Sequence, residues 1–184
     1  MKLCIDLCCG LGGFSQAFAD DHDWEVVRID ISPRMAANII ADVKHLPLKE
    51  NLRPDVLLMS PPCEGFSTAN SKWPQHGIKQ AMEIVGACLE AVAILKPRYW
   101  MLENPKGRLR WFMATRPRTV LNLGDYGYRT IKPTDLWGNV DVGLVPGHRQ
   151  NNGGLRFKEG PRRPSERAMM PYNFSKAVKE AMER

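Results

Sequence analysis

A cysteine and a glutamate are the two side chains of this sequence best placed to do chemistry, because each follows a short apolar segment. Cys63 comes after the segment 56–59 and a pair of prolines, which restrict the backbone and present the thiol rigidly. Glu103 comes directly after the segment 99–102. A partly exposed thiol beside a basic surface can act as a nucleophile, and a facing carboxyl group suits acid catalysis on a heteroaromatic ring.

Both residues also have simpler interpretations. Glu103 could equally be a strand-end acid that pairs with Lys106 or Arg108. A lone cysteine is usually a small buried hydrophobe, and for Cys63 the rigid turn favours the nucleophile instead, although no single activating base is evident. We adopt the buried interpretation for the four other cysteines, Cys4, Cys8, Cys9 and Cys88.

A glycine-rich turn and a later acidic residue indicate a cofactor site. Residues 9–13 read Cys-Gly-Leu-Gly-Gly after an apolar run, and glycine lets a backbone approach a ligand closely. Asp30 lies about 20 residues further on, where a carboxylate can accept both ribose hydroxyls of an adenosine. Ser15 occupies the third glycine position of G-x-G-x-x-G, so the pattern favours S-adenosylmethionine over a dinucleotide.

Strand and helix patterns alternate along the chain and define the elements that must position these residues. Strands are predicted at 2–9, 26–31, 39–43, 56–59 and 99–102, with weaker candidates at 120–123 and 134–137. Helices are predicted at 14–19, at 80–96 and after Pro171. This order predicts an α/β, Rossmann-like fold with a mostly parallel sheet, helices on both faces, and the polar strand ends along one edge.

The charge distribution favours a polyanionic partner. The net charge is +6, but residues 1–95 carry 8 basic and 12 acidic side chains while residues 96–184 carry 18 and 8. A one-sided positive surface of this kind is typical of nucleic-acid binding. The acidic Asp6 near the N-terminus and the lack of a membrane-spanning apolar run predict a cytoplasmic protein. Cysteines without C-x-x-C spacing indicate neither disulfides nor a metal site.

Three motifs, in this order and at this approximate spacing, resemble the DNA (cytosine-5-)-methyltransferase family, and its compact, phage-like members most closely. They are Asp-Leu-Cys-Cys-Gly-Leu-Gly-Gly-Phe at 6–14, Pro-Pro-Cys at 61–63 followed by Phe66-Ser67, and Glu-Asn-Pro at 103–105. The resemblance spans residues 3 to about 139 and implies an S-adenosylmethionine-dependent methyltransferase fold and restriction-modification or phage biology.

The resemblance also implies roles for individual residues. Cys63 would attack carbon 6 of a flipped-out cytosine in DNA, and Glu103 would donate to ring nitrogen 3, so that carbon 5 accepts a methyl group. Asp30 with Ile31 would bind the ribose and adenine, Asp42 with Val43 the adenine amino group and ring. The methionine part and the methyl donor would be lined by Cys8, Cys9, Gly10, Leu11, Gly12, Ser60 and Pro62.

Two departures from the family concern the substrate. The sequence 129–134 replaces the Gln-x-Arg-x-Arg motif of larger members, with Lys132 and Thr134 in the arginine places and Arg129 able to compensate. The target-recognition region is reduced to a basic, glycine-rich loop, which predicts low or very short sequence specificity. The expected substrate contacts are Ser67, Asn104, Arg129, Lys132 and Thr134, with phosphate contacts from Arg149, Arg156, Lys158, Arg162 and Arg163.

The predicted organisation is a catalytic domain at 1–142, a minimal recognition loop at 143–164 and a C-terminal segment at 165–184 whose helix docks on the catalytic domain. The sequence leaves open a protein partner that supplies specificity, and it does not define the oligomeric state. Two other functions also stay open: an RNA cytosine-5 methyltransferase, although no second cysteine motif of the usual RNA enzymes is visible, and an inactive nucleic-acid or cofactor binding module.

Overall fold

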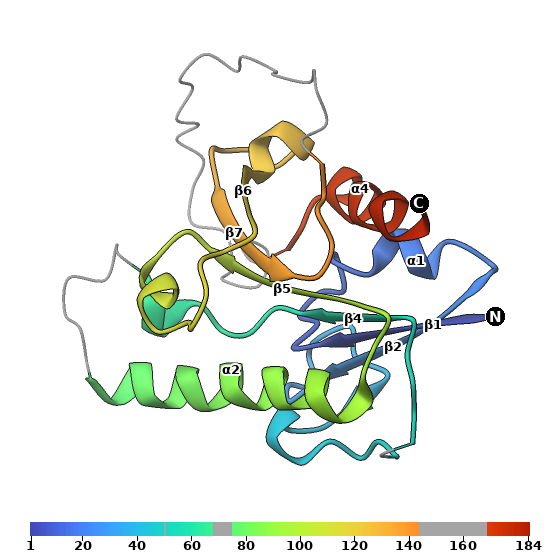
Figure 1. Ribbon diagram of the computed structural model, residues 1–184, viewed down its shortest axis with the longest axis horizontal. Helices are drawn as coiled ribbons and strands as arrows, with labels where there is room; N and C mark the ends of the chain where they lie inside the picture. The colour runs from blue at the N-terminus through green and yellow to red at the C-terminus, as the bar shows by residue number, and fades with distance from the viewer. Residues whose placement is uncertain (50, 68–74, 144–168) are drawn as a thin grey trace.

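Seven strands form one mixed sheet in the order β3-β2-β1-β4-β5-β7-β6 in the computed structural model, which describes residues 1–49, 51–67, 75–143 and 169–184 (Figure 1). The first five strands run parallel, and β7 runs antiparallel to both of its neighbours. The strands are β1 (Lys2–Leu7), β2 (Trp24–Asp30), β3 (Ile39–Ile40), β4 (Val56–Met59), β5 (Tyr99–Pro105), β6 (Thr119–Asn122) and β7 (Pro133–Gly138).

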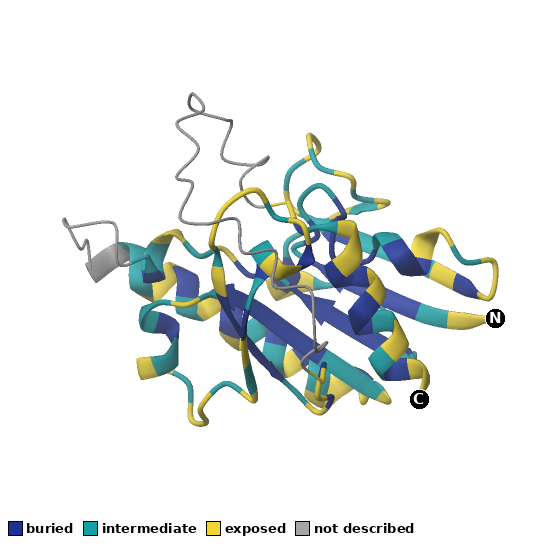
Figure 2. Cartoon of the chain, turned by 90° about the horizontal axis from the view of Figure 1, so that it is seen from above, coloured by how far each residue is buried: buried dark blue, intermediate teal, exposed yellow. Residues whose placement is uncertain are grey.

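The sheet is covered on both faces, which explains why its middle strand, β4, reads as an unbroken apolar run. All four residues of β4 are buried. The long helix α2 (Gln75–Leu95) packs on one face through Ala81, Val85 and Cys88, among others. The helices α1 (Gln16–Ala19) and α4 (Tyr172–Glu183) cover the other face. The strands lie between these two layers in Figure 1, and Figure 2 shows that their central residues are buried. The predicted α/β fold with helices on both faces is therefore confirmed.

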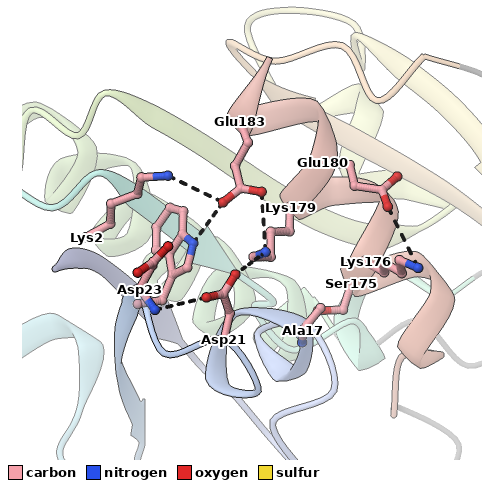
Figure 3. A network of polar contacts seen from close by, with 10 residues as sticks. Lys2, Ala17, Asp21, Asp23, Ser175, Lys176, Lys179, Glu180 and Glu183 are labelled. Atoms are coloured by element: carbon pink, nitrogen blue, oxygen red, sulfur yellow. Dashed lines mark hydrogen bonds and ion pairs between the residues drawn. The ribbon is translucent and has the colours of Figure 1, made fainter.

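Polar contacts fix α4 against α1 and the start of β2 (Figure 3). The Ser175 hydroxyl donates to the Phe14 carbonyl at 2.7 Å and accepts from the Ala17 amide at 3.0 Å. Lys179 pairs with Asp21 at 2.5 Å. Because the aromatic ring of Phe174 also packs on Phe14, this C-terminal helix is part of the same core as the first turn of the chain.

Several predicted boundaries differ from the observed ones. The first helix begins at Gln16 and not at residue 14, and α2 begins five residues earlier than its apolar repeat predicted. The predicted strand 39–43 is limited to Ile39–Ile40, because Asp42 caps a 3-10 turn, η1 (Val43–His45), through the Lys44 amide. Strand β5 continues through Pro105, so Glu103 lies inside a strand and not beyond its end.

Three further 3-10 turns carry the connections. They are η2 (Glu64–Phe66), η3 (Arg108–Trp111) and η4 (Leu123–Tyr126). Except for Gly143, the predicted basic loop at 143–164 lies outside the described residues, as do its five basic side chains at 149, 156, 158, 162 and 163. Across the described ranges, none of the helices combines the length and apolar character that crossing a membrane requires.

The segment before α4 packs directly on the glycine turn, and this contact yields a prediction. A Cβ atom at Gly13 would lie 2.6 Å from the Met170 carbonyl oxygen and 2.9 Å from its nitrogen. Gly13→Ala should therefore lower the free energy of unfolding by about 1–3 kcal/mol, measured by urea denaturation. The matched control is Gly86→Ala on the exposed face of α2, where nothing lies within 4 Å; it should stabilise by about 0.5–1 kcal/mol. Equal stability of Gly13→Ala and the native protein would contradict this packing.

Candidate active site

The carboxyl ends of β1, β4 and the parallel part of β5 lie at one edge of the sheet, and the candidate residues follow from that edge (Figure 1). The glycine turn leaves β1 there, and the Pro-Pro-Cys segment leaves β4. Because parallel strands end on the same side, three segments that are distant in sequence are brought together.

A cavity of about 460 Å³ at this edge contains both predicted catalytic side chains. Cys63 and Glu103 line it together with the glycine turn and Lys132. The described residues that line it are Cys8, Cys9, Gly10, Leu11, Gly13, Phe14, Ser60, Pro61, Pro62, Cys63, Glu64, Ser67, Glu103, Pro105, Lys132, Met169 and Met170. The thiol and the carboxyl group can thus reach one small molecule.

Cys63 stands at the start of η2 and is half-buried. The Phe66 amide donates to its carbonyl oxygen at 3.0 Å, which closes the turn. Burial raises the pKa of the Cys63 thiol, and the nearby Glu103 carboxylate raises it further, while Lys132 lowers it. The sequence led us to expect a basic surface that favours the thiolate; in the structure, desolvation and a neighbouring acid outweigh the one nearby lysine.

Tight packing holds the Cys63 turn in place. The Asn104 side chain amide donates to the Pro61 carbonyl at 3.0 Å, so β5 is tied to the Pro-Pro-Cys segment. A Cβ atom at Gly65 would lie 2.7 Å from the Gly77 carbonyl of α2. Asn104, which the sequence predicted as a substrate contact, therefore contacts the loop that carries the thiol and is itself buried.

Glu103 is buried in β5, where it pairs with Leu136 of β7. Burial is the main cause that raises the pKa of its carboxyl group to about 7, with Asp135 adding to the rise and Lys132 opposing it. Its Oε1 atom is buried without a hydrogen-bond partner among the described residues. This buried carboxyl differs from the strand-end acid paired with Lys106 or Arg108 that the sequence also allowed, and near pH 7 a large share of it is protonated.

Lys132 is the basic residue among the described residues that line this cavity. Its backbone amide donates to the Asn122 side chain at 2.8 Å, and its ammonium group lies 5.0 Å from the centre of the Tyr128 ring. Thr134 is fully buried, does not line the cavity, and donates from its hydroxyl to the Lys132 carbonyl at 3.1 Å. Arg129 is exposed and is not part of the lining. Of the three residues predicted in place of the arginine motif, Lys132 alone lines this cavity.

A second cavity of about 370 Å³ adjoins the first, since Cys8 and Pro62 line both. It contains Asp30, Ile31, Asp42 and Val43, and also Ile29, Ala41, Lys44, Gln80, Glu83 and Ile84. Asp30 accepts from the Gly10 amide at 3.0 Å and from the Ser32 amide at 2.9 Å. These bonds fix the Asp30 carboxylate beside the glycine turn.

The glycine turn has a strained backbone and a buried polar support. Cys8, Gly10 and Gly12 have φ of 55°, 54° and 76°, a region that L side chains rarely adopt. Under the turn, the Ser15 hydroxyl donates to Asp6 at 2.6 Å and accepts from the Arg28 guanidinium at 2.9 Å. Burial raises the pKa of Asp6 to about 7. The sequence analysis used Asp6 only as an acidic residue near the N-terminus and as the first residue of the glycine motif at 6–14.

The two joined cavities fit an adenosyl sulfonium cofactor. Gly10 has open space where a Cβ would lie, so the turn is accessible to a ligand. The Ser60 hydroxyl lines the first cavity, and its oxygen is buried without a partner among the described residues. Carboxylates and apolar side chains line the second cavity, as an adenosine with ribose hydroxyls requires. The residues that could hold the cofactor therefore span both cavities.

Some lining residues had no signal in the sequence. Met169 and Met170 reach the cavity from the far end of the chain, and α2 contributes Gln80, Glu83 and Ile84 to the second cavity. These contacts depend on tertiary packing. Cys8 was taken as a buried hydrophobe and also as a cofactor contact; the structure places it half-buried between the two cavities.

The fold and the paired cavities at one sheet edge define a Rossmann-like α/β methyltransferase. The sequence profile of the C-5 cytosine-specific DNA methylase family matches residues 3–131, and the chain belongs to this family. No curated protein sequence matches.

Solved structures that are similar to the chain include two methyltransferases. One is described as a DNA modification methyltransferase encoded within a prophage of E. coli, with a TM-score of 0.56 and 19% identity over 78% of this chain and 49% of that chain. The other is the Dnmt2 methyltransferase of S. pombe, with a TM-score of 0.46 and 18% identity over 75% of this chain and 50% of that chain. The chain thus spans about half the length of either protein, and the first likeness supports the fold.

The buried Glu103 predicts a pH-dependent stability. The pKa of Glu103 rises from 4.5 when exposed to about 7 in the fold, so folding favours its protonated form. The contribution of Glu103 to the free energy of unfolding is therefore present at low pH and is lost as the pH rises through 7. Glu103→Gln cannot ionise, and the stability of this variant relative to the native protein should increase by roughly 2–3 kcal/mol between pH 5 and pH 9. Urea unfolding at both pH values measures the change. Asp6 titrates in both proteins, so its effect cancels in the difference between their free energies of unfolding. If this difference does not vary with pH, Glu103 is not a buried group that titrates in this range.

Proposed function

We propose that the protein methylates carbon 5 of cytosine in DNA, with S-adenosylmethionine as the methyl donor and a transient covalent bond to Cys63. The supporting observation is that Cys63 and Glu103 line one cavity that joins a second cavity suited to an adenosine. A cytosine must leave the base stack to reach this recess, because a paired base inside a duplex exposes only its edges.

The covalent step makes carbon 5 reactive. The Cys63 sulfur bonds to carbon 6 of cytosine while protonated Glu103 donates its proton to ring nitrogen 3, which turns an aromatic ring into an electron-rich enamine. S-adenosylmethionine, when bound, supplies an electrophilic methyl group to carbon 5. Loss of the carbon 5 proton to solvent then restores the double bond between carbons 5 and 6 and expels the Cys63 thiolate, and ring nitrogen 3 returns its proton to Glu103.

The proton states of Cys63 and Glu103 are coupled. A negative Glu103 raises the pKa of the thiol, so a neutral Glu103 makes the thiolate easier to form. The reactive arrangement has one proton on the pair, held by the carboxyl group, with the sulfur ionised. Lys132 lowers the pKa of both groups and stabilises the negative charge that the pair carries. We assign this role to Lys132 in place of the arginine motif of larger members.

The remaining predicted residues hold the two ligands. Asp30 and Asp42 would bind the ribose and the adenine amino group, with Ile31 and Val43 against the rings. The glycine turn and Ser60 would border the methionine part. Asn104 and Thr134 act indirectly, on the Cys63 loop and on Lys132. We retain residues 1–142 as the catalytic domain and 143–164 as a minimal recognition loop with phosphate contacts, which implies low sequence specificity.

Transfer of tritium-labelled methyl groups from S-adenosylmethionine tests this function. Duplex DNA should be labelled at carbon 5 of cytosine, and Cys63→Ser should reduce labelling to background because a hydroxyl is a far weaker nucleophile at neutral pH. Glu103→Gln should reduce the rate by about 100-fold or more, the usual contribution of a positioned acid. Cys4→Ser is the matched control, since this buried thiol lies in β1 and lines neither of the two cavities.

The same assay separates DNA methylation from the other functions. Preferred labelling of transfer RNA would identify an RNA methyltransferase with the same chemistry. Binding of S-adenosylmethionine without labelling of any nucleic acid would identify an inactive binding module. Labelling that persists in Cys63→Ser would show that Cys63 is not the nucleophile.

A further inference from the structure

A surface segment next to the cavity, residues 106–118, combines basic and aromatic side chains and has no role in the chemistry described so far. It contains five basic residues and no acidic one: Lys106, Arg108, Arg110, Arg116 and Arg118. Within it, η3 and the next residue expose two large rings, Trp111 with 68% and Phe112 with 42% of their surface accessible. We call residues 106–118 the basic aromatic segment.

Contacts of Leu109, Arg110 and Phe112 hold η3 in place. Leu109 is 1% exposed and fills the core beneath the turn. The Arg110 guanidinium donates to the buried carboxylate of Asp135 at 2.7 Å, which ties η3 to β7. The Phe112 ring lies 6.3 Å from that of Phe66. The turn is thus held from three sides while an indole stays largely in solvent, where its exposure costs hydrophobic free energy.

The basic aromatic segment adjoins the catalytic turn. It begins directly after Pro105, which lines the cavity with Cys63. Phe66, the ring against Phe112, is the last residue of η2, the turn that Cys63 starts. A Cβ atom at Gly107 would lie 2.6 Å from the Phe66 carbonyl oxygen, so the two backbones are in close contact. In Figure 1 the teal η2 and the yellow-green η3 lie side by side at the end of the molecule where β4 ends.

We infer that Trp111 stacks on an unpaired base of the nucleic-acid strand that carries the target cytosine, while the exposed Arg116 and Arg118 bind the phosphates of that strand. The inference rests on the proposed function in so far as the substrate is a nucleic acid, and it adds a specific binding surface. Extrusion of the target base unstacks its neighbours, and an exposed ring beside the cavity gives one of them a new stacking partner. The positive charge of residues 106–118 complements the phosphate backbone.

Binding of a fluorescein-labelled oligothymidylate, followed by anisotropy without cofactor, tests this surface. This probe contains no cytosine, so the result does not depend on methyl transfer. Trp111→Ala should weaken binding by about 5- to 150-fold, the loss expected for one base–aromatic stack. Trp111→Phe should retain most of the affinity, because a smaller ring still stacks. The quenching of tryptophan fluorescence on binding should be reduced in Trp111→Phe, which a purely structural role would not predict.

The control is Tyr172→Ala, which removes another exposed ring, 48% accessible, that lies beside Asp20, Asp21 and Asp23. It should bind the oligothymidylate like the native protein. Arg116→Gln combined with Arg118→Gln should lower the slope of log affinity against log salt by about 1–2. Unchanged affinity and quenching in Trp111→Ala would overturn the inference, as would binding confined to duplex DNA. The probe contains no cytosine and no cofactor is present. A native protein that binds the probe through Trp111 but methylates no nucleic acid would therefore refute the proposed function alone, so the two failures are distinguishable.

Discussion

Removal of a carboxyl group from water is the physical constraint on which the site depends. Glu103 lies inside a strand that is covered on both sides, and burial is the main cause that raises its pKa to about 7. The same enclosure raises the pKa of Cys63, so the two groups share their proton balance through a low-dielectric cavity. A more open site would leave the acid ionised and unable to donate to a ring nitrogen at neutral pH. In the proposed reaction, the burial that raises the pKa of Glu103 therefore also lets it act as an acid near neutral pH.

The scaffold keeps this arrangement in place through contacts that span the whole chain. Asn104 ties β5 to the proline loop, and Ser175 of α4 ties the far end of the chain to the turn after β1. Asp6 and Arg28 both hydrogen-bond to the Ser15 hydroxyl, which follows the glycine turn and holds it in place. Glycine is needed at Gly13 because the Met170 backbone occupies the space of a side chain. The glycine turn is thus fixed in part by Ser175, which lies more than 150 positions further along the sequence.

The sequence predicted most of the sheet because strand signals are local. Strand β4 has the predicted bounds, and the order of polar strand ends predicted which segments meet at one edge. The boundaries that failed have two causes. Asp42 caps a 3-10 turn instead of continuing a strand, and Glu103 stays in β5 because β7, which is distant in sequence, pairs with it. The lining by Met169 and Met170 and the raised pKa of Cys63 depend on tertiary packing, for which a single sequence contains no periodic signal.

Mass spectrometry of the covalent complex with DNA that contains 5-fluorocytosine, formed with S-adenosylmethionine, tests the account most directly, because fluorine at carbon 5 blocks release of the thiol. We expect the modified base on a peptide that contains Cys63, at much lower yield in Glu103→Gln and absent in Cys63→Ser. A covalent bond to any of the other cysteines would contradict the claim that the reaction takes place in the cavity shared by Cys63 and Glu103. The same holds if the native protein binds the cofactor but forms no covalent bond with this DNA.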